Sequence, residues 1–300
     1  MKILVTGAGG LIGRYLASFF ADQGEEVIAS YRNTLPDLIT DRADNIRCLR
    51  LDLSEGMDNL ESVDVVIHAA AHTHLIPDST TEQYIRSNLV GMLNLAEYAK
   101  RTRPKILIYL STISMFGQIE VAELDEDTPP NDPGIYGMTK YLGEQILRDH
   151  ADDFPSVSIR LPGVVGPGYF TPWIGSVLTK AAWDEDIEFY NPDSLFNNIV
   201  DLEELGRFIS CAVASGINDF QSINLAANEA ITTREVVDTI ISLTGSKSQV
   251  KARNVDRTSF VINCQKAISV FGFDPATTMS MVSRYVNANL ELLGRSQALR

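Results

Sequence analysis

The sequence has 300 residues, of which 45% are hydrophobic and 21% are charged. These values are close to the average for globular proteins, so they exclude a disordered chain and a fibrous repeat. The formal net charge of -14 disfavours binding to nucleic acid or to an anionic membrane, which requires a basic surface. No apolar run approaches the roughly 20 residues of a membrane span.

The three cysteines, Cys48, Cys211 and Cys264, are odd in number and far apart in the sequence. This usage is typical of buried thiols in a reducing compartment and not of a disulfide framework. The start of the chain has glycines where a signal peptide needs a continuous apolar stretch. We therefore expect a cytoplasmic protein.

Short runs of β-forming residues alternate with helical patterns in the first half of the chain. The predicted strands are residues 2–6, 26–30, 46–51, 63–68, 105–110 and 157–161. Because each crossover between parallel strands passes over the sheet, this alternation predicts an α/β fold with a doubly wound parallel sheet. Later elements are predicted as helices near 202–214, 233–244 and 279–293, and a strand at 222–225.

A glycine-rich turn follows the first predicted strand. Gly7, Gly10 and Gly13 precede or open an amphipathic helix, and this context turns a weak pattern into a predicted phosphate cradle. The glycines let the backbone approach a pyrophosphate, and free N–H groups where Leu11 and Ile12 begin the helix favour an anion.

This cradle identifies the sheet as a dinucleotide-binding, Rossmann-type domain. We expect residues 1–165 and about 195–218 to form it. Residues from about 166 to 194, together with 219–300, are expected to form a smaller C-terminal α/β lobe that binds the substrate. The loop-rich texture of 162–173 and 191–198 supports a change of architecture after the sheet.

The end of the second strand is expected to read the adenosine ribose. An acidic residue there would bond both ribose hydroxyls of NAD, whereas this chain has Tyr31 and Arg32. An arginine can pair with a 2'-phosphate, so the sequence favours NADP over NAD, although Arg32 could instead lie in solvent or stack on adenine. Asp52 and Leu53 are a candidate contact with the adenine edge, and a helix cap is the alternative for Asp52.

Tyr136 and Lys140 are four residues apart, which places a phenol and an ammonium on one face of a helix. Lowering the pKa of a tyrosine from about 10 to near 7 takes roughly 4 kcal/mol of anion stabilisation, which Lys140 and an oxidised nicotinamide could supply. The spacing alone is common on amphipathic helices. It gains support from Thr112 and Ser114, whose hydroxyls follow the strand 105–110 and can bond a substrate oxygen.

This ordered set of motifs resembles the extended short-chain dehydrogenase/reductase family, particularly its nucleotide-sugar epimerase, reductase and dehydratase branch. The resemblance covers nearly the whole chain and rests on residues 6–13, 52–53, 68–71, Asn88, 111–112, Tyr136, Lys140, Arg160 and 166–168.

The resemblance implies a role for each matching residue. Tyr136 would be the acid and base, Lys140 its electrostatic partner and a ribose ligand, and Thr112 the donor to the substrate oxygen. Ala69 and Ala70 would line the nicotinamide side of the cleft. Asn88 is similar to a structural asparagine that supports the active-site strands.

Three departures from the family pattern bear on the reaction. Dehydratases place an Asp-Glu pair after the threonine, where this chain has Ile113 and Ser114, so dehydration is disfavoured. Epimerases often carry an asparagine where this chain has Gly163, and an Arg-Asp-aromatic run where it has 194–196. Arg253 looks like the family's late diphosphate arginine, and a solvated surface arginine is the alternative.

Three histidines and two loop segments could have a function, but each also has a structural interpretation. His68, His72 and His74 could suggest a metal site, but a strand end without a further Cys or Glu disfavours one, so no metal is expected; His72 or His74 could face the substrate. The acidic run 123–127 is expected to be a solvated loop. The aromatic stretch 169–173 is either a lid or ordinary packing.

The sequence therefore predicts an NAD(P)-dependent enzyme that transfers hydride at a sugar carbon, with C4 of a nucleotide-activated sugar as the leading site and 4-epimerisation as the leading reaction. The alternative is an NADPH-dependent reductase of a 4-keto sugar or another carbonyl. An alternative from another class is a cofactor-sensing regulator without catalysis. The resemblance also implies a homodimer packed through the helices that carry Asn88 and Tyr136.

Overall fold

The computed structural model describes residues 1–38, 43–256 and 258–297. The chain divides into two compact units. Unit 1 comprises Met1–Gln118, Thr128–Leu161 and Gly206–Ile223, and unit 2 comprises Ile119–Asp127, Pro162–Leu205 and Asn224–Arg300. The expected domains differ from these units chiefly at 119–127 and 195–205, which lie in unit 2.

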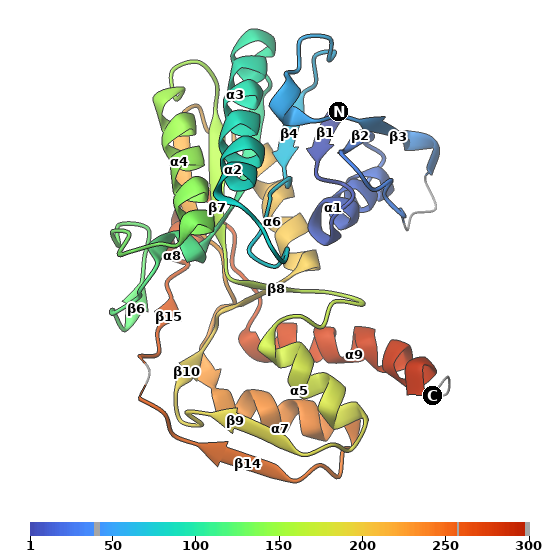
Figure 1. The fold of residues 1–300 in the computed structure, drawn as a ribbon, viewed down its shortest axis with the longest axis vertical. Helices are drawn as coiled ribbons and strands as arrows, with labels where there is room; N and C mark the ends of the chain where they lie inside the picture. The colour runs from blue at the N-terminus through green and yellow to red at the C-terminus, as the bar shows by residue number, and fades with distance from the viewer. Residues whose placement is uncertain (39–42, 257, 298–300) are drawn as a thin grey trace. The chain divides into compact units, whose positions relative to one another are not determined.

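Unit 1 is built around one sheet (Figure 1). Its strands are β1 (Lys2–Thr6), β2 (Glu26–Tyr31), β3 (Ile46–Arg50), β4 (Val65–His68), β5 (Ile106–Thr112), β7 (Ser156–Leu161) and β12 (Phe220–Asn224). Its helices are α1 (Leu11–Asp22), α2 (Thr81–Tyr84), the π-helix η3 (Ile85–Val90), α3 (Gly91–Thr102), α4 (Ile135–Asp149) and, from Gly206 on, α6 (Leu202–Ala214). Short 3-10 turns are η1 (Ala43–Asn45), η2 (Leu53–Glu55) and η4 (Ile113–Phe116). The predicted strands and the helix at 202–214 are confirmed.

The strand order explains where a ligand can bind. Within the described residues the sheet has the order β12-β7-β5-β4-β1-β2-β3, and the pairs from β3 through to β7 are parallel. Successive strands run outward on one side from β1 and on the other side from β4, so the order reverses between these two strands. Ligands of doubly wound sheets bind at the carboxyl ends of the strands at such a reversal.

Helices pack on the sheet because its central strands are apolar on both sides. Leu4 and Leu107 join a buried cluster with Leu95 of α3 and Leu147 of α4. A Cβ at Gly206 would come within 2.9 Å of the Phe19 ring, so α6 and α1 pack closely together. The predicted doubly wound α/β fold is confirmed.

Unit 2 has its own core. Its strands are β6 (Glu123–Leu124), β8 (Gly163–Val165), β9 (Ile187–Tyr190), β10 (Leu195–Phe196), β11 (Ile199–Asp201), β13 (Ile231–Thr232), β14 (Val250–Arg253) and β15 (Val261–Ile262). Its helices are α5 (Trp173–Ala182), α7 (Thr233–Thr244), α8 (Gln265–Phe271) and α9 (Thr278–Gln297). A buried cluster joins residues of α5, α7 and α9, including Leu178, Ile240 and Val282.

Two loop expectations change in unit 2. The acidic run 123–127 is not wholly a solvated loop, because β6 pairs in parallel with β15 and Leu124 is fully buried. The aromatic stretch 169–173 leads into α5, where Phe170 packs against the core and the ring of Trp173 meets that of Phe196 at 5.3 Å. These contacts are packing. Among the described residues no helix is long and apolar enough to cross a membrane.

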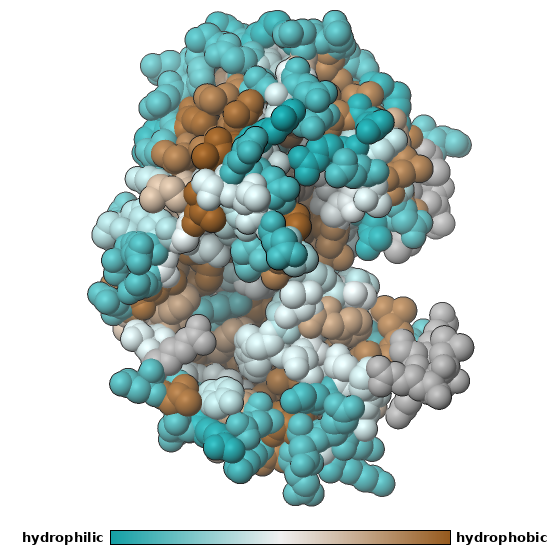
Figure 2. Space-filling view, viewed as in Figure 1, coloured by the Kyte–Doolittle hydropathy of each residue, from teal (hydrophilic) through white to brown (hydrophobic). Residues whose placement is uncertain are grey.

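One apolar surface lies on the helices of unit 1. We call it the apolar stripe and define it by exposed residues of η3, α3 and α4: Ile85, Leu93, Ile135, Met138 and Leu142. Figure 2 shows hydrophobic surface gathered where α3 and α4 lie. The side chains of the apolar stripe are exposed to water, and only a partner that packs on them would bury them. The apolar stripe is therefore a candidate contact surface.

Candidate active site

The site begins where β1 and β4 end side by side. Thr6 and His68 are paired in register, and Thr6 Oγ1 lies 2.7 Å from His68 Nδ1. The N–H of Ala70 donates to Thr6 Oγ1 at 3.3 Å. Burial, and then the charge of Lys140, lower the pKa of His68 to about 3, so the imidazole is neutral and acts as a fixed partner of Thr6.

The glycine turn is shaped by close backbone approach. Gly7 has φ of +74°, and a Cβ there would lie 2.6 Å from the Cα and N of Ala70. A Cβ at Gly13 would collide with the carbonyl oxygen of Gly7. The expected cofactor residues Gly7, Gly13, Ala69 and Ala70 are thus brought together, since the loops after β1 and β4 touch.

The start of α1 offers free donors to an anion. Gly10 is the N-cap residue and supplies no side-chain cap, while its carbonyl accepts from Arg14 N–H at 3.0 Å. The N–H groups of the first turn, including Leu11 and Ile12, have no partner inside the helix. This arrangement fits the pyrophosphate of a dinucleotide.

The residues expected at the ribose lie at the ends of β2 and β3. Arg32 Nη1 donates to Ser87 Oγ at 2.9 Å, and its carbonyl accepts from Arg50 Nε at 3.2 Å. Tyr31 is partly exposed beside it. Arg32 is exposed and has a hydrogen-bond partner, Ser87, on η3.

Asp52 is the N-cap residue of η2, and a helix cap was one of the two roles expected for it. Its Oδ1 accepts from the N–H and the hydroxyl of Ser54 at 3.0 and 2.8 Å. Burial alone would raise the pKa of Asp52, but the Ser54 hydrogen bonds and the charges of Arg32 and Arg86 lower it overall. The side chain of Leu53 is buried in the core, and its carbonyl accepts from Asn94 Nδ2 at 2.7 Å.

Thr112 and Tyr136 meet at the end of β5. A Cβ at Gly137 would collide with the carbonyl oxygen of Ser114, so α4 rests directly on the turn η4. Thr112 caps this turn: its Oγ1 accepts from Ser114 N–H at 3.1 Å and donates to Ser114 Oγ at 3.2 Å. The three expected residues Thr112, Ser114 and Tyr136 therefore lie together.

The pKa of Tyr136 is raised in the protein alone. Burial and then Tyr84 raise the pKa of Tyr136 to about 12, although a hydrogen bond with Thr112 lowers it in part. In the protein alone the phenol is therefore protonated. The expected lowering required an oxidised nicotinamide as well as Lys140, and it stays a prediction.

Lys140 is buried one turn further along α4, at 2% exposure. Its Nζ lies 4.0 Å from the centre of the Tyr109 ring. Burial lowers the pKa of Lys140 to about 7, and Glu144 opposes this shift. Tyr109 and Glu144 are neighbours of the site that the sequence motifs did not predict.

Asn88 of η3 joins α4 to the loop that follows β4 and carries His72 and His74. Asn88 Oδ1 accepts from His72 N–H at 2.7 Å, and Asn88 Nδ2 donates to Thr139 Oγ1 at 3.0 Å. His72 Nε2 lies 2.8 Å from Ser79 Oγ, whereas the ring of His74 lies 5.3 Å from that of Tyr136. Of the two histidines considered for the substrate, His74 is the one beside Tyr136. The described part of the chain holds no group of three side chains that could ligate a metal.

Arg253 lies in unit 2, on β14. Its Nε pairs with Glu188 Oε1 at 2.9 Å, and its side chain is 52% exposed. Its carbonyl accepts from Asn191 N–H at 2.7 Å, while Asn191 Oδ1 accepts from Val255 N–H at 2.8 Å. The chain after Arg253 thus forms a wall together with the loop after β9.

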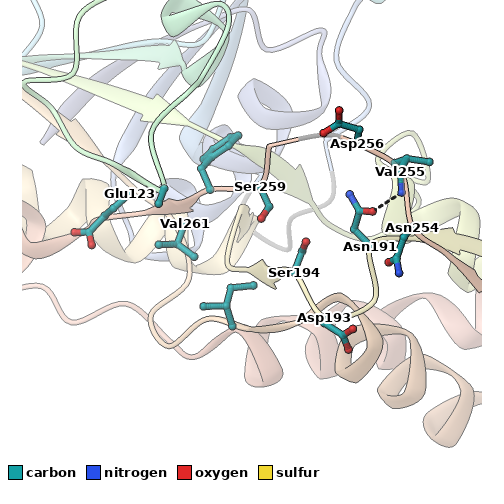
Figure 3. Close-up of a pocket in the computed structure, with 12 residues that line it drawn as sticks. Glu123, Asn191, Asp193, Ser194, Asn254, Val255, Asp256, Ser259 and Val261 are labelled. Carbon is teal, nitrogen blue, oxygen red and sulfur yellow. Dashed lines mark hydrogen bonds between the residues drawn. The ribbon is translucent and has the colours of Figure 1, made fainter.

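This wall encloses a pocket of about 750 Å³ within unit 2 (Figure 3). Leu195, Phe260 and Val261 give it apolar sides, and Asn191, Asn254 and three carboxylates give it polar ones; the carboxylates are Glu123, Asp193 and Asp256. The described lining residues include neither lysine nor arginine. A diphosphate near this pocket would depend on an arginine such as Arg253.

Comparison with known proteins gives a consistent result. The model of the NAD dependent epimerase/dehydratase family matches residues 3–182. A dTDP-4-dehydro-6-deoxy-D-allose reductase from a Streptomyces species is 25% identical in an alignment 300 residues long. The alignment covers 91% of this chain and 91% of the relative. A UDP-glucose 4-epimerase from Lactobacillus helveticus is 28% identical over 176 residues, which cover 55% of this chain and 52% of the relative.

A solved structure shares the fold over nearly the whole length. It is that of UDP-glucuronic acid 4-epimerase from Bacillus cereus in complex with NAD, with a TM-score of 0.78, 21% identity and coverage of 99% of both chains. The family match covers more than half of the chain, and its relatives are epimerases and reductases. The chain is therefore an NAD(P)-dependent enzyme of the short-chain dehydrogenase type and belongs to the NAD dependent epimerase/dehydratase family.

Proposed function

We propose that the enzyme transfers hydride at C4 of a nucleotide-activated sugar and works as a 4-epimerase. The observation that carries this proposal is the meeting of Thr112, Ser114 and Tyr136 at the end of β5, on the same sheet edge as the glycine turn. Both sets of residues lie at the carboxyl ends of parallel strands in unit 1, where such sheets bind ligands.

In this proposal each side chain has a defined task. Thr112 donates a hydrogen bond to the substrate oxygen, and Tyr136 removes its proton or returns it. A nicotinamide held by the glycine turn and beside Ala69 and Ala70 would supply the hydride acceptor and donor. Lys140 contributes positive charge to the site and binds the cofactor ribose. Ile113 and Ser114 offer no acid and base pair, so elimination of water is not part of the proposal.

A second candidate is reduction of a 4-keto sugar, and two observations favour it. The Streptomyces reductase matches this chain over 91% of both lengths. Tyr136 is protonated in the protein alone, because its pKa is raised to about 12. A protonated phenol is ready to give its proton to the alkoxide that reduction forms. Epimerisation needs the same phenol both to accept and to return a proton.

The nucleotide half of the substrate is assigned to unit 2. Leu195, Val255 and Phe260 provide apolar surface for a base, and Asn191 and Asn254 provide groups for ribose hydroxyls. Arg253 would exchange its exposed pairing with Glu188 for the diphosphate, to which an arginine can donate two parallel hydrogen bonds.

The cofactor preference rests on Arg32. Among the described residues no carboxylate lies within ion-pair distance of it, and its Nη1 is placed by Ser87. A guanidinium without a paired carboxylate, with no acidic residue at the end of β2, favours a 2'-phosphate. We therefore propose NADP as the preferred cofactor and NAD as the alternative.

We also propose that two copies pair through the apolar stripe. Its residues repeat along η3, α3 and α4 at helical spacing, which is typical of helices that pack against partner helices. Burying them in a second copy of the same stripe is the simplest closed arrangement, because a two-fold interface uses one surface twice.

Replacing Tyr136 by Phe should lower kcat by roughly 100-fold or more, because the proton donor and acceptor is lost, while cofactor binding is kept. Nucleotide sugars are incubated with the enzyme and cofactor, C4 epimers are measured by NMR, and net reduction by NADPH absorbance. Tyr141→Phe on the same helix is the control. Wild-type turnover in Tyr136→Phe would contradict the catalytic role. Absence of both products across a broad panel would overturn the assignment of a nucleotide-sugar substrate.

Replacing Arg32 by Ala should weaken NADPH binding by roughly 10-fold or more, because a charged hydrogen bond is lost, with little change for NADH. Binding is measured by the fluorescence of the reduced cofactors. Arg47→Ala, an exposed arginine on β3, is the matched control. Equal losses for both cofactors would rule out a 2'-phosphate contact.

Replacing Arg253 by Ala should raise KM for a nucleotide sugar by roughly 10-fold and leave kcat nearly unchanged, since the residue binds a part of the substrate that does not react. Lys251→Ala on the same strand is the control. An unchanged KM would assign Arg253 to the surface pair with Glu188 alone.

Sedimentation equilibrium should give the mass of two chains for the wild type. Leu93→Glu combined with Leu142→Glu should give a single chain, because two charges would be buried in the interface. A single-chain mass for the wild type would exclude the dimer. A dimer that survives both substitutions would place the interface elsewhere.

A further inference from the structure

Lys140 is a buried cation without a close anionic partner. It is 2% exposed, and within the described residues its Nζ has neither a hydrogen bond nor a carboxylate at ion-pair distance. Glu144 lies one turn further along α4, but its oxygens are occupied by Arg160, which donates from Nε at 3.2 Å to each and from Nη2 at 2.9 Å. Much of its charge is thereby neutralised.

The face of the Tyr109 ring takes the place of an anion. Lys140 Nζ lies 4.0 Å from the ring centre, within the roughly 6 Å over which a ring face attracts a cation. The ring is 1% exposed. In such a dry position this attraction is stronger than at a surface.

Tyr109 is itself fixed on its remaining sides. His68 stacks with it at 5.5 Å and 16°, and His68 is held by Thr6. A Cβ at Gly143 would collide with Tyr109 Oη and lie 2.9 Å from Cζ. Gly143 thus leaves the space on α4 that the edge of the ring fills.

We propose that Tyr109 is a positioning residue, whose ring face keeps the Lys140 side chain charged and directed within the site, and that Gly143 is the small residue that admits the ring. This inference rests on the proposed function for its catalytic meaning. Its physical content, the charge of Lys140, can be measured separately.

The groups that face Lys140 come from four elements. They are His68 from β4, Tyr109 from β5, Tyr136 and Glu144 from α4, and Arg160 from β7 behind Glu144. His68 is neutral and Tyr136 is protonated. Two groups therefore favour the ammonium over the amine: the ring face of Tyr109, 4.0 Å from Nζ, and the carboxylate of Glu144, which is itself paired with Arg160.

The test follows the charge of Lys140 directly by NMR in protein labelled with 13C at lysine Cε. Lys140→Met identifies the resonance, and its titration midpoint is compared between wild type, Tyr109→Phe and Tyr109→Leu. The phenyl ring should keep the wild-type midpoint. Leu should lower it by roughly one pH unit or more, since the attraction to the charged form is lost. An unchanged or higher midpoint in Tyr109→Leu would overturn the proposal.

Two further variants keep the test decisive if Tyr109→Leu folds poorly. Gly143→Ala should displace the Tyr109 ring and so also lower the titration midpoint of Lys140. Adding Tyr109→Phe should raise the midpoint part of the way back, because the Tyr109 hydroxyl that clashes with the new Cβ is removed. Tyr98→Leu, a buried tyrosine of α3 in the same unit, controls for lost packing and should leave the midpoint unchanged. A Gly143→Ala midpoint equal to that of wild type would count against the role of the ring.

Activity separates this inference from the proposed function. If no substrate turns over but Tyr109→Leu lowers the titration midpoint of Lys140, the ring still stabilises the charged form of Lys140. In that case only the proposed reaction is wrong. If turnover occurs, the alkaline limb of kcat should move to lower pH in Tyr109→Leu, because Lys140 loses its proton earlier, and should stay in place in Tyr109→Phe. A purely structural role would lower kcat without moving the limb.

Discussion

The whole site depends on how closely β1 and β4 end beside each other. The pairing of Thr6 with His68 brings the glycine turn against the loop after β4, and only a glycine at residue 7 can accept Ala70 at that distance. The same pairing lets Thr6 hold His68, and His68 in turn stacks on Tyr109. The cofactor cradle and the support of Lys140 therefore share one constraint, the register of two strands.

The helix α4 is placed by close contacts along its length. Gly137 touches the backbone of Ser114, and Gly143 touches the ring of Tyr109. Between them, Thr139 accepts from Asn88 and donates to the carbonyl of Tyr136. Directly after Gly143, Glu144 binds Arg160 in a buried pair. The glycines let α4 approach its neighbours closely, and the paired polar groups fix the orientation of the helix. The positions of the Tyr136 phenol and the Lys140 ammonium therefore follow from the position of α4.

Much of unit 1 could be predicted because its signals are local. Apolar strands bounded by turns marked the sheet, and the glycines after residues 2–6 marked the cradle. The spacing of Tyr136 and Lys140 marked the helix that we propose carries the catalytic residues. Tyr109 gave no such signal, because it is one apolar residue in an apolar strand. Glu144, four residues after Lys140, could have been found by the same helical spacing. The strand formed by Glu123 and Leu124 could not, since its partner β15 lies far along the sequence and acidic residues are poor strand formers.

Burial sets the charge of the proposed catalytic pair, and it acts on both members in the same sense. It raises the pKa of Tyr136 and lowers that of Lys140, so each group is driven towards its neutral form. The side chains alone therefore do not produce the tyrosinate that removal of a hydroxyl proton requires. A positive charge brought by an oxidised cofactor has the sign that lowers the pKa of Tyr136. A reduced, uncharged ring would leave the phenol protonated and able to donate. Because Tyr136 is buried, the charge of a bound cofactor would thus set whether the phenol keeps its proton.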